Sequence, residues 1–327
     1  MRCPICDQSA QRFGYNRNGS RRFRCVPCRR TFTTINGSTD RRCLSKDKII
    51  LCLRMLLEGN SIRSVERLTE VHRDTIISAM VEAGAKCERF LEERVQSINV
   101  VDVEADEIWG FVGCKERTRL YRGLGEEVGD AWCFTAIERS TKMILAWHLG
   151  KRTPDSTAWF ALKLANATNG RFQLTTDGYT PYRTEIPAMF GERIDYAALV
   201  KVYGAATGNG TEVRYSPGEV IDTHSLVLLG APEEDLICTS HAERHNLTIR
   251  MQVRRLTRLT NAHSKKWENH RAALGLFFAY YNFCRVHSTL TDNTRDGGQP
   301  TRKTTPAMAA GLADHVWSVE ELLYEIS

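Results

Sequence analysis

Long uncharged stretches are missing from this sequence of 327 residues. No run approaches the ~20 apolar residues that a membrane-spanning helix needs. The first residues offer no apolar core for a secretion signal, because Arg2, Cys3 and Pro4 occupy its place. Internal repeats and low-complexity tracts are also absent. We therefore expect a soluble, cytoplasmic protein, long enough to bury a sizeable core and to form two or three structural units.

Acidic residues are scarce near the N-terminus. The first 46 residues contain 11 Lys and Arg but only two acids, Asp7 and Asp40, a net charge of +9. Since the whole chain carries +6, the remainder carries −3. A basic segment joined to a nearly neutral body indicates contact with nucleic acid. A solvated basic arm without a partner is the alternative.

The eleven cysteines are numerous, but we do not expect disulfides in a long chain without a secretion signal. Cys3 and Cys6 form one C-x-x-C pair, Cys25 and Cys28 form another, and 18 residues separate the pairs. This spacing predicts a zinc ribbon over 1–46, in which four thiolates bind one structural Zn²⁺. An unmetallated cysteine cluster is the alternative. Arginines and aromatic residues between the pairs favour a surface that contacts phosphates.

Helical periodicity begins near Asp47 and predicts a helix-turn-helix DNA-binding domain over 47–95. A first helix ends at Gly59, a second follows Ser61 as its N-cap, and a third begins near Arg73. Such a domain places polar side chains of its second and third helices on DNA. The residues predicted to contact DNA are Arg63, Arg67, His72, Arg73 and Thr75. A plain helical bundle has the same periodicity.

Strand and helix patterns alternate over 96–290. The pattern predicts three antiparallel strands, a helix, a parallel strand, a second helix and a last strand, which is the order of a ribonuclease H-like α/β fold. The expected strands cover 100–112, 132–138, 142–149, 172–176 and 196–202, and the expected helices cover 154–169 and a segment starting near 181. Residues 291–327 form a C-terminal tail.

Candidate metal ligands occur in two of these strands. Asp102, Glu104 and Asp106 share one face of the first strand by period two. We choose Asp106, which adjoins an apolar stretch expected at the centre of the sheet. Asp177 ends a later strand, where α/β sheets present ligands. An exposed strand face for Asp106, and an ordinary Asp-Gly turn for Asp177, are the alternatives.

The third candidate acid, Glu243, opens a basic helix. Ser240 to Glu243 has the pattern of a capping box, which gives Glu243 a purely local alternative role. Arg250, Arg254 and Arg258 recur every four residues, however, and a cationic stripe favours a polyanionic partner. Asn246 is expected on the same face as Glu243. Together the three acids favour a two-metal phosphoryl-transfer site for Mg²⁺ or Mn²⁺.

Three short blocks carry a family resemblance: Asp106 to Gly113 (DEIWGFVG), Thr175 to Tyr179 (TTDGY) and Glu243 to Leu247 (ERHNL). They resemble the signature blocks of DDE transposases, most closely the insertion-sequence-one family. Residues 280–290 and Thr305-Pro306-Ala307 are similar to the C-terminal end of many such enzymes. The resemblance implies that Asp106, Asp177 and Glu243 are the catalytic trio. It also implies a homodimer or larger assembly that acts on double-stranded DNA, both transposon ends and target, in the bacterial nucleoid.

One segment departs from the family pattern. Residues 204–237 separate the second and third acids widely and are interpreted as a β-hairpin insertion, with Glu219 and Glu234 as weaker substitutes for Glu243. The expected function is metal-dependent cleavage at the ends of an insertion sequence and joining of their 3′-hydroxyls to target DNA. The alternatives are a zinc-ribbon transcription regulator and a ribonuclease H-like nuclease without strand transfer.

Overall fold

The structure of the protein is a computed structural model that describes residues 2–3, 6–15, 21–33, 44–204, 218, 220–258, 260–291 and 303–326. The chain divides into two compact units, Met1–Lys46 and Asp47–Ser327. No helix in the described parts of the chain is long and apolar enough to cross a membrane.

The first unit is a small antiparallel sheet. Its strands β1 (Ala10–Tyr15), β2 (Arg21–Cys25) and β3 (Thr31–Thr33) are neighbours in that order. Among its described residues, only Cys3, Ala10 and Cys25 are buried. So small an apolar core cannot stabilise a fold by itself, so the cysteines must contribute.

The second unit begins with the three predicted helices, α1 (Lys46–Leu57), α2 (Ile62–Thr69) and α3 (Arg73–Arg94). Ser61 caps α2 as expected, because its side chain accepts from the Ser64 N–H at 3.1 Å. The long α3 packs closely along α8 (Trp267–Phe283). A Cβ on Gly84 would lie 2.0 Å from the carbonyl oxygen of Ala272. These helices therefore belong to the same compact unit as the sheet.

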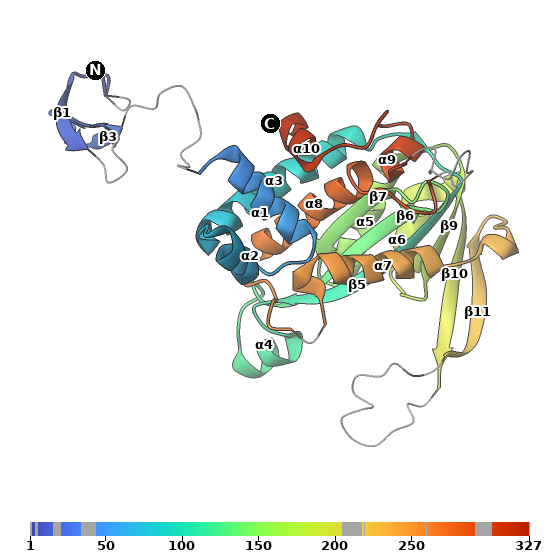
Figure 1. Ribbon diagram of the computed structural model, residues 1–327. Coiled ribbons are helices and arrows are strands. Elements are labelled where there is room, and N and C mark those ends of the chain that lie inside the picture. The colour runs from blue at the N-terminus through green and yellow to red at the C-terminus, as the bar shows by residue number, and fades with distance from the viewer. Residues whose placement is uncertain are drawn as a thin grey trace. The chain divides into compact units, whose positions relative to one another are not determined.

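A six-stranded sheet forms the centre of this unit, in the order β11-β10-β9-β5-β6-β7 (Figure 1). Strands β5, β6 and β7 are antiparallel, β9 lies parallel to β5, and β10 lies parallel to β9. The observed bounds are β5 (Asp102–Val112), β6 (Gly129–Glu138), β7 (Ile144–Gly150), β9 (Phe172–Asp177) and β10 (Ile194–Tyr203). The predicted order of strands and directions is confirmed.

Helices cover both faces of the sheet. On one face, Phe134 of β6 packs against Phe160 of α5 (Pro154–Ala167) and Tyr182 of α6 (Tyr182–Phe190). On the other, Trp147 of β7 packs against Phe278 of α8, beside α7 (Ser240–Gln252). The shorter elements are α4 (Glu116–Arg122), β4 (Ile98–Asn99), β8 (Thr168–Asn169), α9 (Pro306–Ala309) and α10 (Val319–Glu325).

The insertion near 204–237 extends the sheet. Strand β11 (Val220–Leu229) pairs antiparallel with β10, as the predicted hairpin requires. Most of the residues connecting the two strands, including Glu219, lie outside the described residues. Most of β11 is exposed, so this hairpin contributes little to the core. Glu234 lies beyond it, in the short helix η2 (Glu234–Leu236).

Candidate functional site

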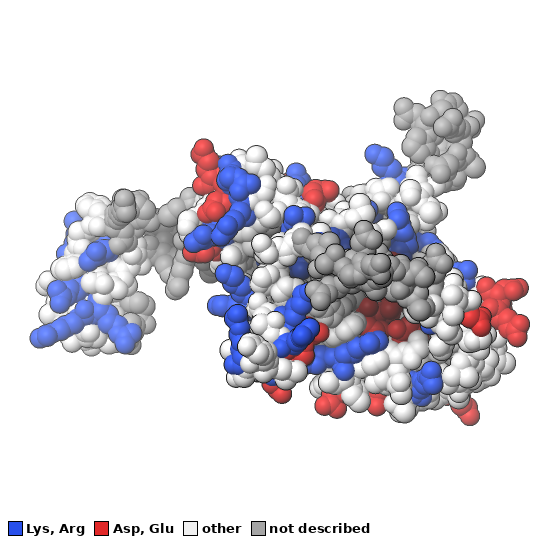
Figure 2. All heavy atoms as spheres, turned by 90° about the horizontal axis from the view of Figure 1, so that it is seen from below, with Lys and Arg blue, Asp and Glu red and all other residues white. Residues whose placement is uncertain are grey.

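Three carboxylates meet where β9 ends beside β5. The last paired residues of these parallel strands are Ala105 and Thr176, and the next residues, Asp106 and Asp177, are both acids. Carboxylate oxygens of Asp106, Glu107 and Asp177 all lie within 4.8 Å of one another. Figure 2 shows a recessed group of acidic side chains bordered by lysines and arginines. The structure thus brings two of the three predicted acids together and adds Glu107.

Glu107 was missed because the period-two rule assigns it to the opposite face from Asp106. Glu107 pairs with Phe134, on the face that α5 and α6 cover. Asp106 is on the face of α7, where its Oδ2 accepts from Asn246 Nδ2 at 2.7 Å. The two side chains meet because β9 stops at Asp177 and leaves β5 uncovered on that side. No local sequence pattern predicts this meeting.

The carboxylates of this cluster are held against their own repulsion. Burial raises the pKa of Asp106 to about 8, with further contributions from the charges of Glu107 and Asp177. Burial and the charge of Asp177 raise the pKa of Glu107 to about 7. The pKa of Asp177 is also raised, mainly by burial, although the Tyr179 N–H donates to its Oδ1 at 2.9 Å. A site with these properties favours cations.

Arg152 supplies one such cation from the segment after β7. Its Nε donates to Glu107 Oε1 at 2.7 Å, and its Nη2 lies 4.0 Å from Asp177 Oδ2. The guanidinium carbon lies 4.6 Å from the ring centre of Trp132 and 4.1 Å from that of Tyr179. Two rings and a carboxylate therefore fix this group in one place. Nothing in the sequence around Arg152 signals this role.

The other two acids of the β5 face have partners of their own. Asp102 accepts from Arg139 Nη1 at 3.0 Å. The fully buried Glu104 accepts from the backbone N–H groups of His241 and Ala242, at 2.7 and 3.0 Å, and contacts the His241 ring. Glu104 thereby binds the N-terminus of α7, where a negative charge is stabilised by the helix dipole. These contacts agree with the choice of Asp106 as the acid of the site.

Glu243 lies outside the 4.8 Å cluster. The expected capping box is wrong, because the N-cap of α7 is Thr239, one residue earlier, and it makes no side-chain capping bond. Glu243 Oε1 instead accepts from Thr239 Oγ1 at 2.7 Å and pairs with Lys201 of β10. Its charge still contributes to the raised pKa of both Asp106 and Asp177, so it lies near the cluster. Its catalytic role stays a prediction.

The expected arginine stripe is wrong as a continuous helix. Helix α7 ends at Gln252, and Arg254 lies in the separate short helix η3 (Arg254–Leu256). Arg250 is half-buried and donates to the carbonyl of Leu256 at 3.0 Å. Burial, with a contribution from the charge of Arg258, lowers its pKa to about 10. Arg254 and Arg258 are exposed, so both can contact a ligand, but not along one helix face.

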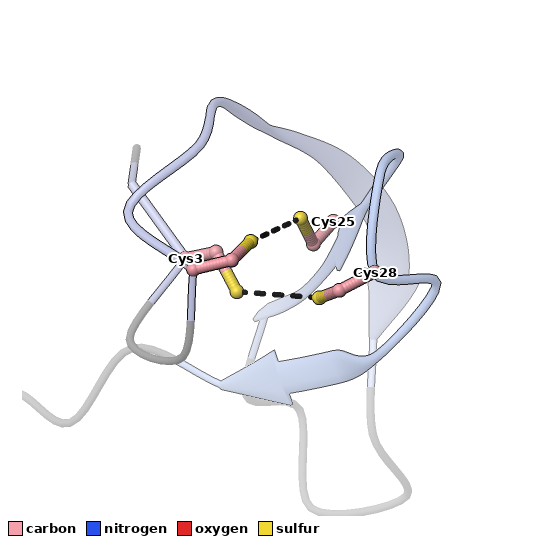
Figure 3. A group of neighbouring side chains, drawn as sticks. Cys3, Cys25 and Cys28 are labelled. Carbon is pink, nitrogen blue, oxygen red and sulfur yellow. Dashed lines mark hydrogen bonds between the residues drawn. The ribbon is translucent and has the colours of Figure 1, made fainter.

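The second candidate site lies in the N-terminal unit (Figure 3). Sulfur atoms of Cys3, Cys6, Cys25 and Cys28 all lie within 4.8 Å of one another. The Cys3 and Cys28 sulfurs are 3.6 Å apart, and those of Cys6 and Cys25 are 3.3 Å apart. Four sulfurs around one zinc, each at ~2.3 Å, lie roughly 3.8 Å apart in a tetrahedron. The cysteines therefore fit a structural Zn²⁺.

The carboxylate cluster fits a hard divalent cation. Its donors are all oxygens, which Mg²⁺ and Mn²⁺ prefer. The Oδ1 atom of Asn246, next to the cluster, is buried and has no hydrogen-bond partner in the described structure. An oxygen-ligated cation with bound water would supply such a partner.

The predicted DNA-reading side chains are accessible. Arg63 and Arg67 of α2 and Arg73 at the start of α3 are exposed, as is His72, whereas Thr75 is half-buried. One side of the rest of α3 is committed to packing, since Ala79, Met80, Ala83 and Cys87 are buried. The exposed first turn of α3 remains accessible to DNA.

Comparisons with known proteins bear on what this site does. No family model matches the chain. The chain is 28% identical over 180 residues to the insertion element iso-IS1n protein InsB of Shigella dysenteriae, a match that covers 55% of this chain and 95% of that relative. The match supports the resemblance to insertion-sequence-one transposases seen in the motifs.

One solved structure, a synaptic complex of the piggyBac transposase with hairpin DNA, overlaps 87% of this chain and 71% of its own. The identity is 8% and the TM-score is 0.36. A similarity this low carries no argument about the fold or the function of this protein.

Proposed function

We propose that the protein is a DDE-type DNA transposase with a ribonuclease H-like core. The observation that carries this proposal is the meeting of Asp106 and Asp177 at the end of β9, on two parallel neighbouring strands. The similarity to an insertion-element protein supports it. So does the strand order, in which three antiparallel strands are followed by two parallel ones.

In this proposal Asp106 and Asp177 hold divalent metal, and Glu243 is the third ligand. Mg²⁺ or Mn²⁺ bound there would polarise the scissile phosphate and activate water, and then the freed 3′-hydroxyl, for attack. Asn246 orients the carboxylate of Asp106 through its amide. Glu243 joins the other two only when its pair with Lys201 opens. Substrate phosphate near Lys201 would favour that opening, because it competes for the ammonium group.

Glu107 and Arg152 form a neutralising pair in the same site. Arg152 pairs with Oε1 of Glu107 and lies beside Asp177, so it reduces the charge of the cluster before metal binds. Its position also suits contact with a phosphate oxygen during the reaction. Glu107 is thus a positioning residue for Arg152 rather than a metal ligand.

The N-terminal parts of the chain find the DNA. The four cysteines would hold a structural Zn²⁺, and the basic strand β2 would lie against phosphates. Arg63, Arg67 and Arg73 would read the ends of the element as a helix-turn-helix does. Asn246, Arg250, Arg254 and Arg258 would contact DNA near the catalytic site. Two or more copies would pair two ends, as the family resemblance implies.

The test is Mg²⁺-dependent cleavage of a DNA duplex with the sequence that flanks this gene. Asp106→Asn and Asp177→Asn should still bind DNA and should cut nothing. Wild-type cleavage rates in Asp106→Asn would overturn the proposal. Joining of cut ends to a target plasmid separates a transposase from a nuclease without strand transfer.

The third ligand is decided by a matched pair of variants. Glu243→Gln should abolish cleavage, whereas Glu107→Gln should lower the rate without removing the response to metal concentration. The opposite result would assign the ligand role to Glu107. Lys201→Met should keep metal-dependent cleavage, because Glu243 is then free to join the site, although the loss of a phosphate contact should weaken DNA binding.

A further inference from the structure

Helix α4 is a seven-residue helix between β5 and β6 that has no buried residue. Figure 1 shows it projecting from the body of the larger unit. Leu120 is 65% exposed and Tyr121 is 90% exposed. An isolated helix this short is unstable in water, so its conformation must be fixed by contacts at its base.

One face of α4 supplies those contacts. The Glu116 N–H donates to Asp130 Oδ1 at 2.9 Å, and the Asp130 N–H donates back to Glu116 Oε2 at 3.2 Å. Arg119, one turn along, donates to Glu116 Oε1 at 2.7 Å, and Lys151 lies 3.7 Å from Oε2. The pair Glu116 and Arg119 therefore fastens the helix to β6 and to the end of β7.

The opposite face is unpartnered and has a distinct composition. Arg117 and Tyr121 share it by i and i+4 spacing, and the exposed Leu120 and Arg122 flank it. Arg117 and the following Arg122 are exposed, and neither forms an ion pair with another residue that the structure describes. The acids of the next turn, Glu126 and Glu127, follow the helix, and Glu126 acts on Arg119 of the fastened face. The outer face thus presents cations around an aromatic ring.

Two cation–π contacts lie between the carboxylate cluster and this helix. Arg152 lies over the ring of Trp132, which is the strand partner of Trp109. Lys115, the residue before α4, lies 5.5 Å from the ring centre of Trp109. Asp106 and Val112 are six residues apart on β5, so the end of β5, four residues before α4, lies roughly 20 Å from the cluster, the length of about six base pairs.

We propose that α4 is a DNA-contacting arm whose outer face grips double-stranded DNA about six base pairs from the cleavage site. Arg117 and Arg122 bind phosphates, and Tyr121 with Leu120 inserts against the bases in the minor groove, as apolar wedges do in other DNA-binding proteins. The occupant we infer is DNA, because its phosphates match the two exposed arginines and its bases match the exposed ring beside them. The inference rests on the proposed function, and it adds a substrate contact remote from the catalytic carboxylates.

The experiment measures binding of the full chain to a fluorescent mixed-sequence duplex of about 30 base pairs at several salt concentrations. Tyr121→Ala should weaken binding about tenfold without changing the salt dependence. The double variant Arg117→Gln, Arg122→Gln should reduce the slope of log affinity against log salt by about 1.8. Tyr121→Phe should bind like the wild type, since the ring is retained.

Tyr324→Ala is the matched control, because Tyr324 of α10 is also exposed, at 78%. Melting temperatures of all variants should equal that of the wild type, since the altered side chains pack against nothing buried. The inference is overturned if Tyr121→Ala binds like Tyr324→Ala and the double variant keeps the wild-type slope. If the wild type itself neither binds nor cuts duplex DNA, the proposed function fails as well. If the wild type cuts DNA and the α4 variants bind DNA like the wild type, the inference about α4 fails and the proposed function stands.

Discussion

The two candidate metal sites of this chain differ in what holds their ligands. The cysteine cluster lies in a unit with almost no core, where two of the four ligands, Cys3 and Cys25, are themselves among the few buried residues. The carboxylate cluster lies on strands packed between helices on both faces. We therefore expect the first unit to need a bound metal in order to fold, whereas the carboxylates of the second site are already together without one.

This difference has a counterpart in charge. A rigid scaffold can hold like charges together at a cost: burial first, and then the neighbouring carboxylates, raise the pKa values of Asp106 and Glu107. The N-terminal unit has no such scaffold, so thiolates that repel one another would simply separate. Metal removal should therefore unfold one unit and leave the other folded.

The largest expected effect comes from breaking the cysteine cluster. Cys25→Ser should remove one zinc per chain and unfold the first unit, because ligation contributes on the order of 10 kcal/mol to folding of such domains. The larger unit should keep its melting temperature and its Mg²⁺-dependent nicking of non-specific DNA. Metal analysis and limited proteolysis measure both results.

Cys114→Ser is the control for that experiment. Cys114 is half-buried in the larger unit and belongs to neither cluster. Zinc content should be unchanged in this variant. A wild-type protein purified without zinc would contradict the assignment of the cysteines.

A second prediction breaks the scaffold instead. Gly84→Ala should destabilise the larger unit by about 3 kcal/mol, because the new methyl group meets the Ala272 carbonyl where α3 crosses α8. Chemical denaturation followed by tryptophan fluorescence measures the loss. Ser78→Ala, at an exposed position of the same helix, should cost nothing measurable. Equal stability of the two variants would show that α3 and α8 separate easily.

A third prediction concerns pH and metal. The pKa values of Asp106 and Glu107 are higher in the folded chain than in the unfolded one, so their contribution to stability is present at low pH and lost as pH rises through about 7 to 8. The metal-free melting temperature should fall as pH rises from about 4, where the carboxyls ionise in the unfolded chain, to about 8, and should level off above that. Mg²⁺ at one hundred times its Kd should restore about 2.7 kcal/mol. Asp106→Asn should flatten the pH dependence and remove most of the metal response; a full response in this variant would contradict the site.

The smallest effect is expected at the exposed arginines. Arg254→Ala should weaken binding to all DNA sequences alike and reduce the salt slope by about 0.9. Arg254→Lys keeps the charge and should keep the slope. A loss confined to one DNA sequence would show that Arg254 reads bases.

The sequence predicted the sheet well because its strands are apolar runs separated by turn residues, and their order follows the chain. The cysteine cluster could also be predicted from the sequence, because the C-x-x-C spacing is a local pattern. Asp106 and Asp177 were chosen because one adjoins an apolar stretch of a predicted strand and the other ends a predicted strand. Glu107 and Arg152 were not, because their meeting depends on where β9 stops and on two rings from different elements. The arginine stripe failed because α7 ends at Gln252, and no residue there signals an end.

Glu104 shows how a structural residue can imitate a catalytic one. It is two residues from Asp106, and it accepts the His241 and Ala242 N–H groups in the first turn of the helix that carries Glu243 and Asn246. Removing its carboxylate would release the start of α7 and misplace both side chains together. An activity screen would then rank Glu104 beside the metal ligands, although it touches no substrate. Metal affinity separates a Glu104 variant from a variant of a proposed ligand. Without Glu104, Asp106 and Asp177 stay in place on the sheet, so metal should still bind.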